Sequence, residues 1–148
     1  LDPNHVDCHR GLAVLLVQTD RPDRAFALLR KWAAREPQLA DAKIELARLY
    51  EEFGDDRVAQ KFLEDAIQQN PNDPRAFLAL GKIRESEGDL HQALQNYQRS
   101  LSLNPQQTMV SERIASLNSR IAGDIQASNG TQLADQSVGV PISTNDRY

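Results

Sequence analysis

The chain has 148 residues, of which 40% are hydrophobic, and its 17 basic and 21 acidic side chains give a net charge of −4. This length suffices for one domain, and the negative balance gives no general attraction to nucleic acid. No stretch approaches the roughly 20 apolar residues that a membrane helix needs, so we expect neither a nucleic-acid partner nor a membrane span. The single cysteine, Cys8, excludes an intrachain disulfide and indicates no compartment.

Prolines recur at a fixed interval of 34 residues along the chain, at Pro3, Pro37, Pro71 and Pro105. A period of this length is typical of a helix–turn–helix unit that cannot bury its own apolar face and therefore stacks on copies of itself. Small residues are needed where two helices approach closely, and large apolar residues fill the gap beside them. Columns of both kinds share the period: Leu12, Leu46 and Leu80; Ala13, Ala47 and Gly81; Ala25, Ala59 and Ala93; and Leu29, Leu63 and Tyr97.

In chain order, the pattern predicts three helix pairs, over residues 5–19 and 22–35, 39–53 and 57–69, and 74–87 and 90–103. Asp73 is an N-cap signal before the first-turn Pro74, and Gly88 is a stop signal. A seventh, capping helix is expected over 108–122, because apolar residues follow one of its faces. The polar composition of 123–148 predicts a flexible tail. The chain thus divides into the end of a preceding unit (1–5), three repeats (6–39, 40–73 and 74–107), the cap and the tail.

These columns resemble the tetratricopeptide repeat (TPR) family, whose first helix carries a large residue and Leu–Gly and whose second carries Ala, an aromatic residue, Ala and a closing Pro. The first unit departs from this pattern, with His9 in place of a bulky apolar residue and Trp32 in place of Ala. The resemblance covers residues 1–107 and implies an all-α, right-handed superhelical solenoid of three TPR helix pairs plus a C-terminal capping helix. The third unit fits best, with Phe77, Leu80, Gly81, Gly88, Ala93, Tyr97, Leu101 and Pro105.

Trp32 and Ala33 exchange the volumes that the other repeats place at these two positions. The corresponding residues are small and then large in the second repeat, Ala66 followed by Ile67. The exchange keeps the total volume nearly constant, which cores tolerate. We therefore predict that Trp32 is buried between the first and second repeats.

The resemblance implies that the first helix of each pair lines a concave face. The 34-residue phase then aligns Arg48 with Lys82 in a basic row and Glu51 with Glu85 in an acidic row. Such a strip suits an extended peptide or a helix that carries both charge signs. The predicted groove residues are Arg10, Val14, Ile44, Arg48, Glu51, Arg75, Leu78, Lys82 and Glu85.

An alternative interpretation is that the groove charges pair within their own helices, at about 0.2–0.5 kcal/mol each. Arg48 would then pair with Glu52 and Lys82 with Glu85. Some family members bind chaperone C-termini through a clamp of Lys, Asn and Arg side chains. That clamp is not predicted here, because Glu45 would repel a carboxylate and because Val14 and Ala79 also replace its polar groups.

No catalytic constellation stands out, since the sequence has neither a glycine-rich phosphate loop nor a Ser–His–Asp set. His5, Cys8 and His9 share one helix face and are metal-ligand types. No fourth ligand is evident, so we interpret them as packing or surface residues. We expect no enzyme activity, metal or cofactor in this chain.

Two hypotheses for function remain. The chain is either a protein-interaction scaffold cut from a longer repeat protein, or an accessory domain of an enzyme or transporter whose active part lies outside it.

Without a preceding repeat, the first helix would expose apolar side chains made for that repeat, namely Val6, Leu12 and Val14–Leu16. We expect this face to favour self-association through the N-terminal end, or to be covered by residues 138–142.

Overall fold

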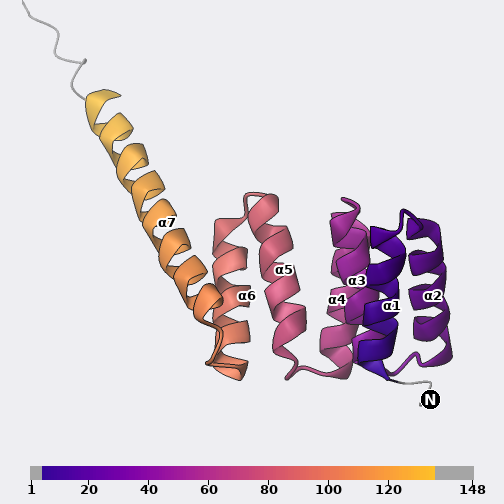
Figure 1. Cartoon of the computed structure of the whole chain (residues 1–148). Helices are drawn as coiled ribbons and strands as arrows, with labels where there is room; N and C mark the ends of the chain where they lie inside the picture. Colours follow the sequence, from indigo (N-terminus) through magenta and orange to yellow (C-terminus); the bar gives the residue numbers. More distant parts are fainter. Residues whose placement is uncertain (1–4, 136–148) are drawn as a thin grey trace, which may run out of the picture.

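The computed structural model describes residues 5–135, and within that range all regular structure is helical, with no strand. Consecutive short helices form three antiparallel pairs that stack side by side, and a long seventh helix follows (Figure 1). This arrangement confirms the predicted all-α repeat solenoid. The helices are α1 (Val6–Gln18), α2 (Pro22–Arg35), α3 (Ala40–Glu52), α4 (Asp56–Gln69), α5 (Pro74–Ser86), α6 (Leu90–Leu103) and α7 (Thr108–Asp135).

Tight turns join the two helices of each pair, and each turn contains one residue with positive φ. Gly54 and Gly88 have φ of 79° and 83°, and Asp20 takes the same position in the first pair with φ of 57°. Glycine adopts this left-handed conformation without a Cβ penalty, and aspartate is one of the few other residues that visit it. After Gly54, the backbone N–H of Asp55 donates to the carbonyl of Tyr50 at 2.9 Å, which closes the helix end.

The small-residue columns lie where helices meet. Ala25, Ala59 and Ala93 are fully buried. A Cβ added to Gly81 would lie 2.7 Å from the ring of Tyr97, so the contact between α5 and α6 requires glycine at this position. The repeated small residues therefore set how closely the paired helices approach.

Trp32 is buried, as predicted, with 3% of its surface exposed. It shares a core cluster with Leu29 from its own helix and with Leu46 and Leu49 from α3. His9 stacks on the indole, with ring centroids 4.3 Å apart and an angle of 10° between the rings. The tryptophan thus joins the first repeat to the second, and the departures from the family pattern at residues 9 and 32 are in contact.

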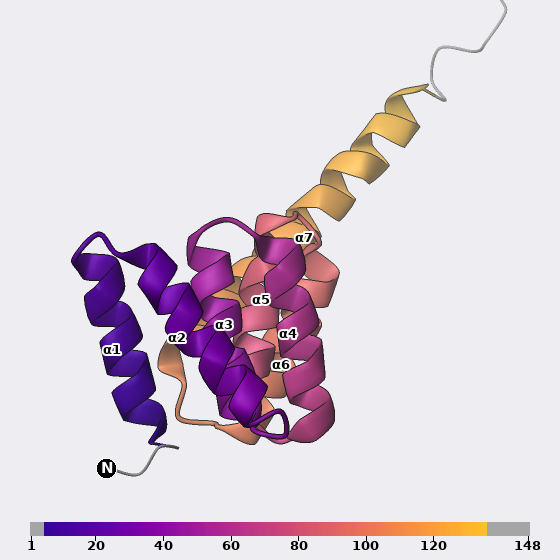
Figure 2. The same cartoon turned by 90° about the vertical axis from the view of Figure 1, so that its right-hand side faces the viewer.

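The capping helix is longer than the sequence predicted. α7 begins at Thr108, as expected, but continues past Ala122 to Asp135 and projects beyond the stack (Figures 1 and 2). The expected stripe packs against the last repeat, with Val110 and Leu117 buried. A glycine inside a helix, such as Gly123, costs only about 1 kcal/mol. The residues on either side of Gly123 are compatible with a helix, so α7 continues through it. The segment 138–142 lies outside the described residues.

The first helix lies at one end of the stack (Figure 2), and part of its apolar surface is uncovered there. Leu12 and Leu15 are 46% and 54% exposed, and Val14 is similarly open, whereas Val6 and Leu16 are partly covered. Only some of the side chains expected on the open face are therefore exposed.

Candidate partner-binding groove

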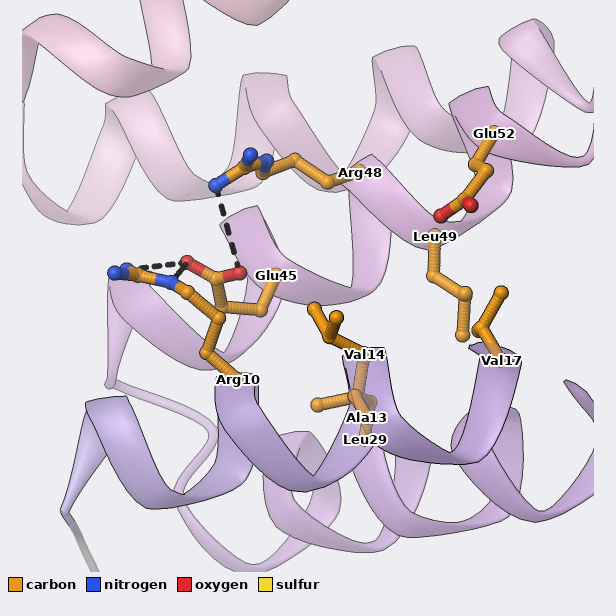
Figure 3. Close-up of a pocket in the computed structure, with 9 residues that line it drawn as sticks. All are labelled: Arg10, Ala13, Val14, Val17, Leu29, Glu45, Arg48, Leu49 and Glu52. Carbon is orange, nitrogen blue, oxygen red and sulfur yellow. Dashed lines mark hydrogen bonds and ion pairs between the residues drawn. The ribbon is translucent and has the colours of Figure 1, made fainter. Parts of the chain in front are cut away.

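The first hollow of the candidate groove lies between α1 and α3 and encloses about 100 Å³. Val14 and Val17 form part of its apolar lining. Arg10 and Glu45 lie at one end, and Glu52 lies at the other end, near Val17 (Figure 3). Besides Val14, two other predicted groove residues line it, namely Arg10 and Arg48. The full lining comprises Arg10, Ala13, Val14, Val17, Leu29, Glu45, Arg48, Leu49 and Glu52.

A buried carboxylate, Glu45, holds this end of the groove together. Its side chain is 5% exposed and accepts two hydrogen bonds from Arg10, from Nε at 2.8 Å and from Nη2 at 2.6 Å. Arg48 and Arg75 approach the same carboxylate at 3.8 and 4.0 Å. The hydrogen bond to Glu45 raises the pKa of Arg10 further above its usual range. Three guanidinium groups from three helices therefore surround one internal anion.

Arg75 is also bound by two aspartates. Its guanidinium donates to Asp73, at 2.6 Å between Nη2 and Oδ2, and to Asp41 one repeat earlier. Asp73 is the N-cap of α5 and accepts from the backbone N–H of Arg75 at 2.9 Å. Burial opposes ionisation of Asp73, but the hydrogen bonds from Arg75 outweigh it and lower the pKa of this carboxyl. Arg75 is therefore committed to joining α3 and α5.

A largely covered carboxylate, Glu85, fixes the capping helix to the last repeat. Its side chain is 9% exposed and accepts from the hydroxyl of Tyr97 at 3.0 Å. It also accepts from Arg113 Nε at 2.7 Å and from Arg120 Nη1 at 3.2 Å. Burial and the hydrogen bond to Glu85 raise the pKa of Tyr97. Glu85 thus contacts both α6 and α7 and is not free to receive a partner.

Among the predicted groove residues, the two cations of the basic row have the most exposed charged side chains. The side chain of Arg48 is 55% exposed, and its ion pair is with Glu45 rather than with the expected Glu52. Lys82 is exposed and forms no ion pair in residues 5–135, so the expected pair with Glu85 is absent there. Glu51 is half-buried, and burial raises its pKa while nearby Lys82 opposes that rise.

The predicted apolar contacts do not behave alike. Ile44 is fully buried in the core between the second and third repeats, so it cannot contact a partner, and this part of the site prediction is wrong. Leu78, in the same column, lines a hollow of about 450 Å³ between α5 and α7 together with Met109 and Arg113. The predicted groove does not include Arg113 and Arg120 of α7, because this helix was predicted only as a cap. Two features of the sequence could have indicated them. The two arginines are spaced by two helical turns and so share one helix face, and Arg120 follows Glu85 by about one repeat length.

Within residues 5–135, no three potential ligands gather as a metal site, and no helix has the length and apolarity needed to cross a bilayer.

Two tetratricopeptide-repeat family models match, one over residues 19–83 and the other over residues 74–107. Human protein O-mannosyl-transferase TMTC1 is 30% identical over an alignment of 120 residues, and the match covers 76% of this chain. The chain spans 13% of the length of that relative.

Two solved structures have the same fold. The first TPR of Spaghetti (RPAP3), bound to the HSP90 peptide SRMEEVD, gives a TM-score of 0.72 at 18% identity and covers 82% of this chain and 99% of that one. The crystal structure of MamA gives a TM-score of 0.68 at 22% identity, covering 82% and 71%. The family matches and the seven-helix architecture of the described residues agree: the chain belongs to the tetratricopeptide repeat family.

Proposed function

We propose that this chain is a protein-interaction scaffold whose concave face holds a peptide or a helix of a partner. The observation that carries the proposal is the layering of charge in the groove. Glu45 is buried and the side chain of Glu85 is largely covered, whereas Arg48 and Lys82 expose their cationic ends beside open hollows. Exposed charges next to apolar surface provide both orientation and affinity for a bound segment.

The chemistry of the groove argues against a chaperone C-terminus as the partner. The RPAP3 domain binds an HSP90 peptide. Here, Glu45 lies among Arg10, Arg48 and Arg75 and supplies from within the fold the carboxylate that such a peptide would bring. A second carboxylate at the same place would be repelled. The partner is therefore expected to contact Lys82 and the exposed side of Arg48, away from Glu45.

The test is site-specific photocrosslinking combined with charge reversal. A photoreactive side chain at Val14, which is exposed in the first hollow, should crosslink to partner proteins. The double change Arg48→Glu and Lys82→Glu should remove those crosslinks. The control, Lys31→Glu with Lys61→Glu, reverses exposed lysines on α2 and α4 and should leave them unchanged. If Val14 gives no crosslinks in the unmodified chain, the groove is not the binding surface. If both double variants crosslink like the unmodified chain, Arg48 and Lys82 do not carry the recognition.

A second candidate is favoured by the similarity to TMTC1, a transferase of which this chain matches only a small part. In this proposal the repeats are an accessory domain that presents substrates or regulators to an enzyme or transporter encoded elsewhere in the same protein. The sequence of the complete gene distinguishes the two. A neighbouring catalytic or transport domain supports the accessory role, whereas repeats alone support the scaffold.

A further inference from the structure

The hollow between α5 and α7 has an apolar interior and an exposed rim. It encloses about 450 Å³. Val110 and Tyr97 are buried at this contact between the last repeat and the capping helix, and Leu78 is half-buried there. Met109 lines the same hollow with 83% of its surface exposed, the largest exposure among the large hydrophobic residues of the described chain. Methionine is a flexible side chain that adapts to irregular apolar partners.

A polar hollow of about 270 Å³ adjoins the apolar one, and the two share Lys82, Tyr97 and Arg113 in their linings. Arg120 also lines the polar hollow. Both arginine side chains are more than half exposed, and each makes one hydrogen bond to Glu85. A guanidinium has five N–H donors, so most of this capacity remains for a ligand.

The balance of charge here is positive, although the whole chain is negative. Lys82, Arg113 and Arg120 contribute three positive charges to the polar hollow, against the single, largely covered carboxylate of Glu85. The resulting surface favours an anionic group placed beside an apolar one. A carboxylate fits this requirement because it accepts bidentate hydrogen bonds from arginine.

We propose that these joined hollows are the specificity subsite of the groove: the apolar hollow binds a large aliphatic side chain of a partner protein, and Lys82 and Arg113 bind a carboxylate next to it. The occupant is thus an acidic segment with a large apolar residue. This inference rests on the proposed function and adds to it which end of the groove selects the partner and by what chemistry.

The experiment measures binding of three end-blocked nonapeptides to the 148-residue chain by NMR titration. The first peptide has a central leucine flanked by glutamates in a glycine–serine background. The second replaces the leucine with alanine, and the third replaces the glutamates with glutamines. We expect the first to bind at least tenfold more tightly than either of the others, with the largest shift changes at Met109, Val110 and Arg113.

Two variants with matched controls locate the subsite. Met109→Glu and Lys82→Glu should each weaken binding of the first peptide by at least tenfold. Leu15→Glu, an equally polar change at an exposed apolar residue of α1, and Lys31→Glu on α2 should not alter it. An acidic residue in the first turn of α7 favours helix formation, so Met109→Glu should keep the circular dichroism spectrum of the unmodified chain.

Each remaining outcome overturns the subsite. If Lys82→Glu weakens binding but Met109→Glu and the alanine peptide do not, the groove binds acidic segments without using the apolar hollow. If the first peptide does not bind at millimolar concentration, the subsite proposal fails. The crosslinking from Val14, which lies at the other end of the groove, tests the proposed function separately in both cases.

Discussion

Replacement of Trp32 by alanine should be among the most damaging single changes in this chain. A buried tryptophan removes about 150–250 Å² from water, and at about 25 cal/mol per Å² this is worth about 4–6 kcal/mol. The indole Nε1 is buried without a hydrogen-bond partner in the described structure, which offsets about 1–3 kcal/mol. These two terms leave about 1–5 kcal/mol, and the cavity left by the indole adds to the loss. We therefore expect Trp32→Ala to lower the free energy of unfolding by about 3–5 kcal/mol, in the range found for large-to-small core changes.

Trp32→Phe separates the volume of the indole from its polar group. Phenylalanine keeps most of the contact with Leu29, Leu46 and Leu49 and the stacking surface for His9, while it removes the unsatisfied N–H. The lost area and the relieved desolvation penalty act in opposite directions. We expect Trp32→Phe to change the free energy of unfolding by at most about 1 kcal/mol.

The assay is urea unfolding followed by far-ultraviolet circular dichroism, because the chain has only one tryptophan and its fluorescence is lost in both variants. Hydrogen exchange shows which helices are destabilised, because neighbouring repeats stabilise each other across their contact. Protection should fall in α1, α2 and α3 before it falls in α6. If Trp32→Ala costs less than about 1 kcal/mol, or if the phenylalanine variant is as unstable as the alanine variant, the packing argument is refuted.

Four further predictions follow from the packing and the charges. Gly81→Ala should lower the free energy of unfolding by about 1–3 kcal/mol, whereas Gly11→Ala, with open space around its added Cβ, should raise it by about 0.5–1 kcal/mol in the same urea titration. Asp73→Ala should cost about 0.5–2 kcal/mol at pH 7 as a lost N-cap. Because the pKa of Asp73 is lowered by folding, its contribution is present above pH ~4 and is lost as the pH falls further, so the difference from the unmodified chain should shrink by pH 2.5. Glu85→Gln should speed hydrogen exchange in α7 while leaving α1 to α4 unchanged. Leu15→Glu should remove any concentration-dependent increase in light scattering if self-association uses the exposed face of α1.

The repeat period predicted the fold because burial and turn geometry recur at each repeat. The period does not predict exposure, as Ile44 and Leu78 show. They occupy the same column, but Ile44 packs with α4 and with α5, the first helix of a complete third repeat, and is fully buried. Leu78 packs in the cluster formed with α6 and α7. In the described residues α7 is a single helix rather than a pair, and a hollow remains between α5 and α7. The position of a repeat within the stack, rather than its own sequence, decides whether that column belongs to the core or to the groove.

The site was only partly predictable for a different reason. The sequence placed Arg10, Arg75 and Glu85 on the concave face, but it could not show that their charges are used by neighbouring helices. Pairing within one helix is visible as a spacing of three or four residues, whereas these groups pair across helices. Only the three-dimensional structure shows which charges remain available, and these are Arg48 and Lys82.

The pairs across helices repeat with the fold itself. Arg10 binds Glu45 at a separation of 35 residues, Asp41 is paired with Arg75 at 34, and Glu85 binds Arg120 at 35. Each ion pair thus joins one groove-lining helix to the next, from α1 to α3 to α5 to α7.

These pairs hold neighbouring helices at a fixed distance, and they also determine the charge of the groove. Removing one partner leaves the other partly buried and unpaired, which destabilises the contact between repeats. A substitution at Arg10 or Arg75 will therefore change the shape of the groove together with its charge, and loss of binding in such a variant does not identify a contact with the partner. Arg48 and Lys82 lie outside this chain of short ion pairs. Lys82 is therefore the position at which a charge reversal tests recognition separately from the fold, whereas Arg48→Glu also places a carboxylate beside the buried Glu45.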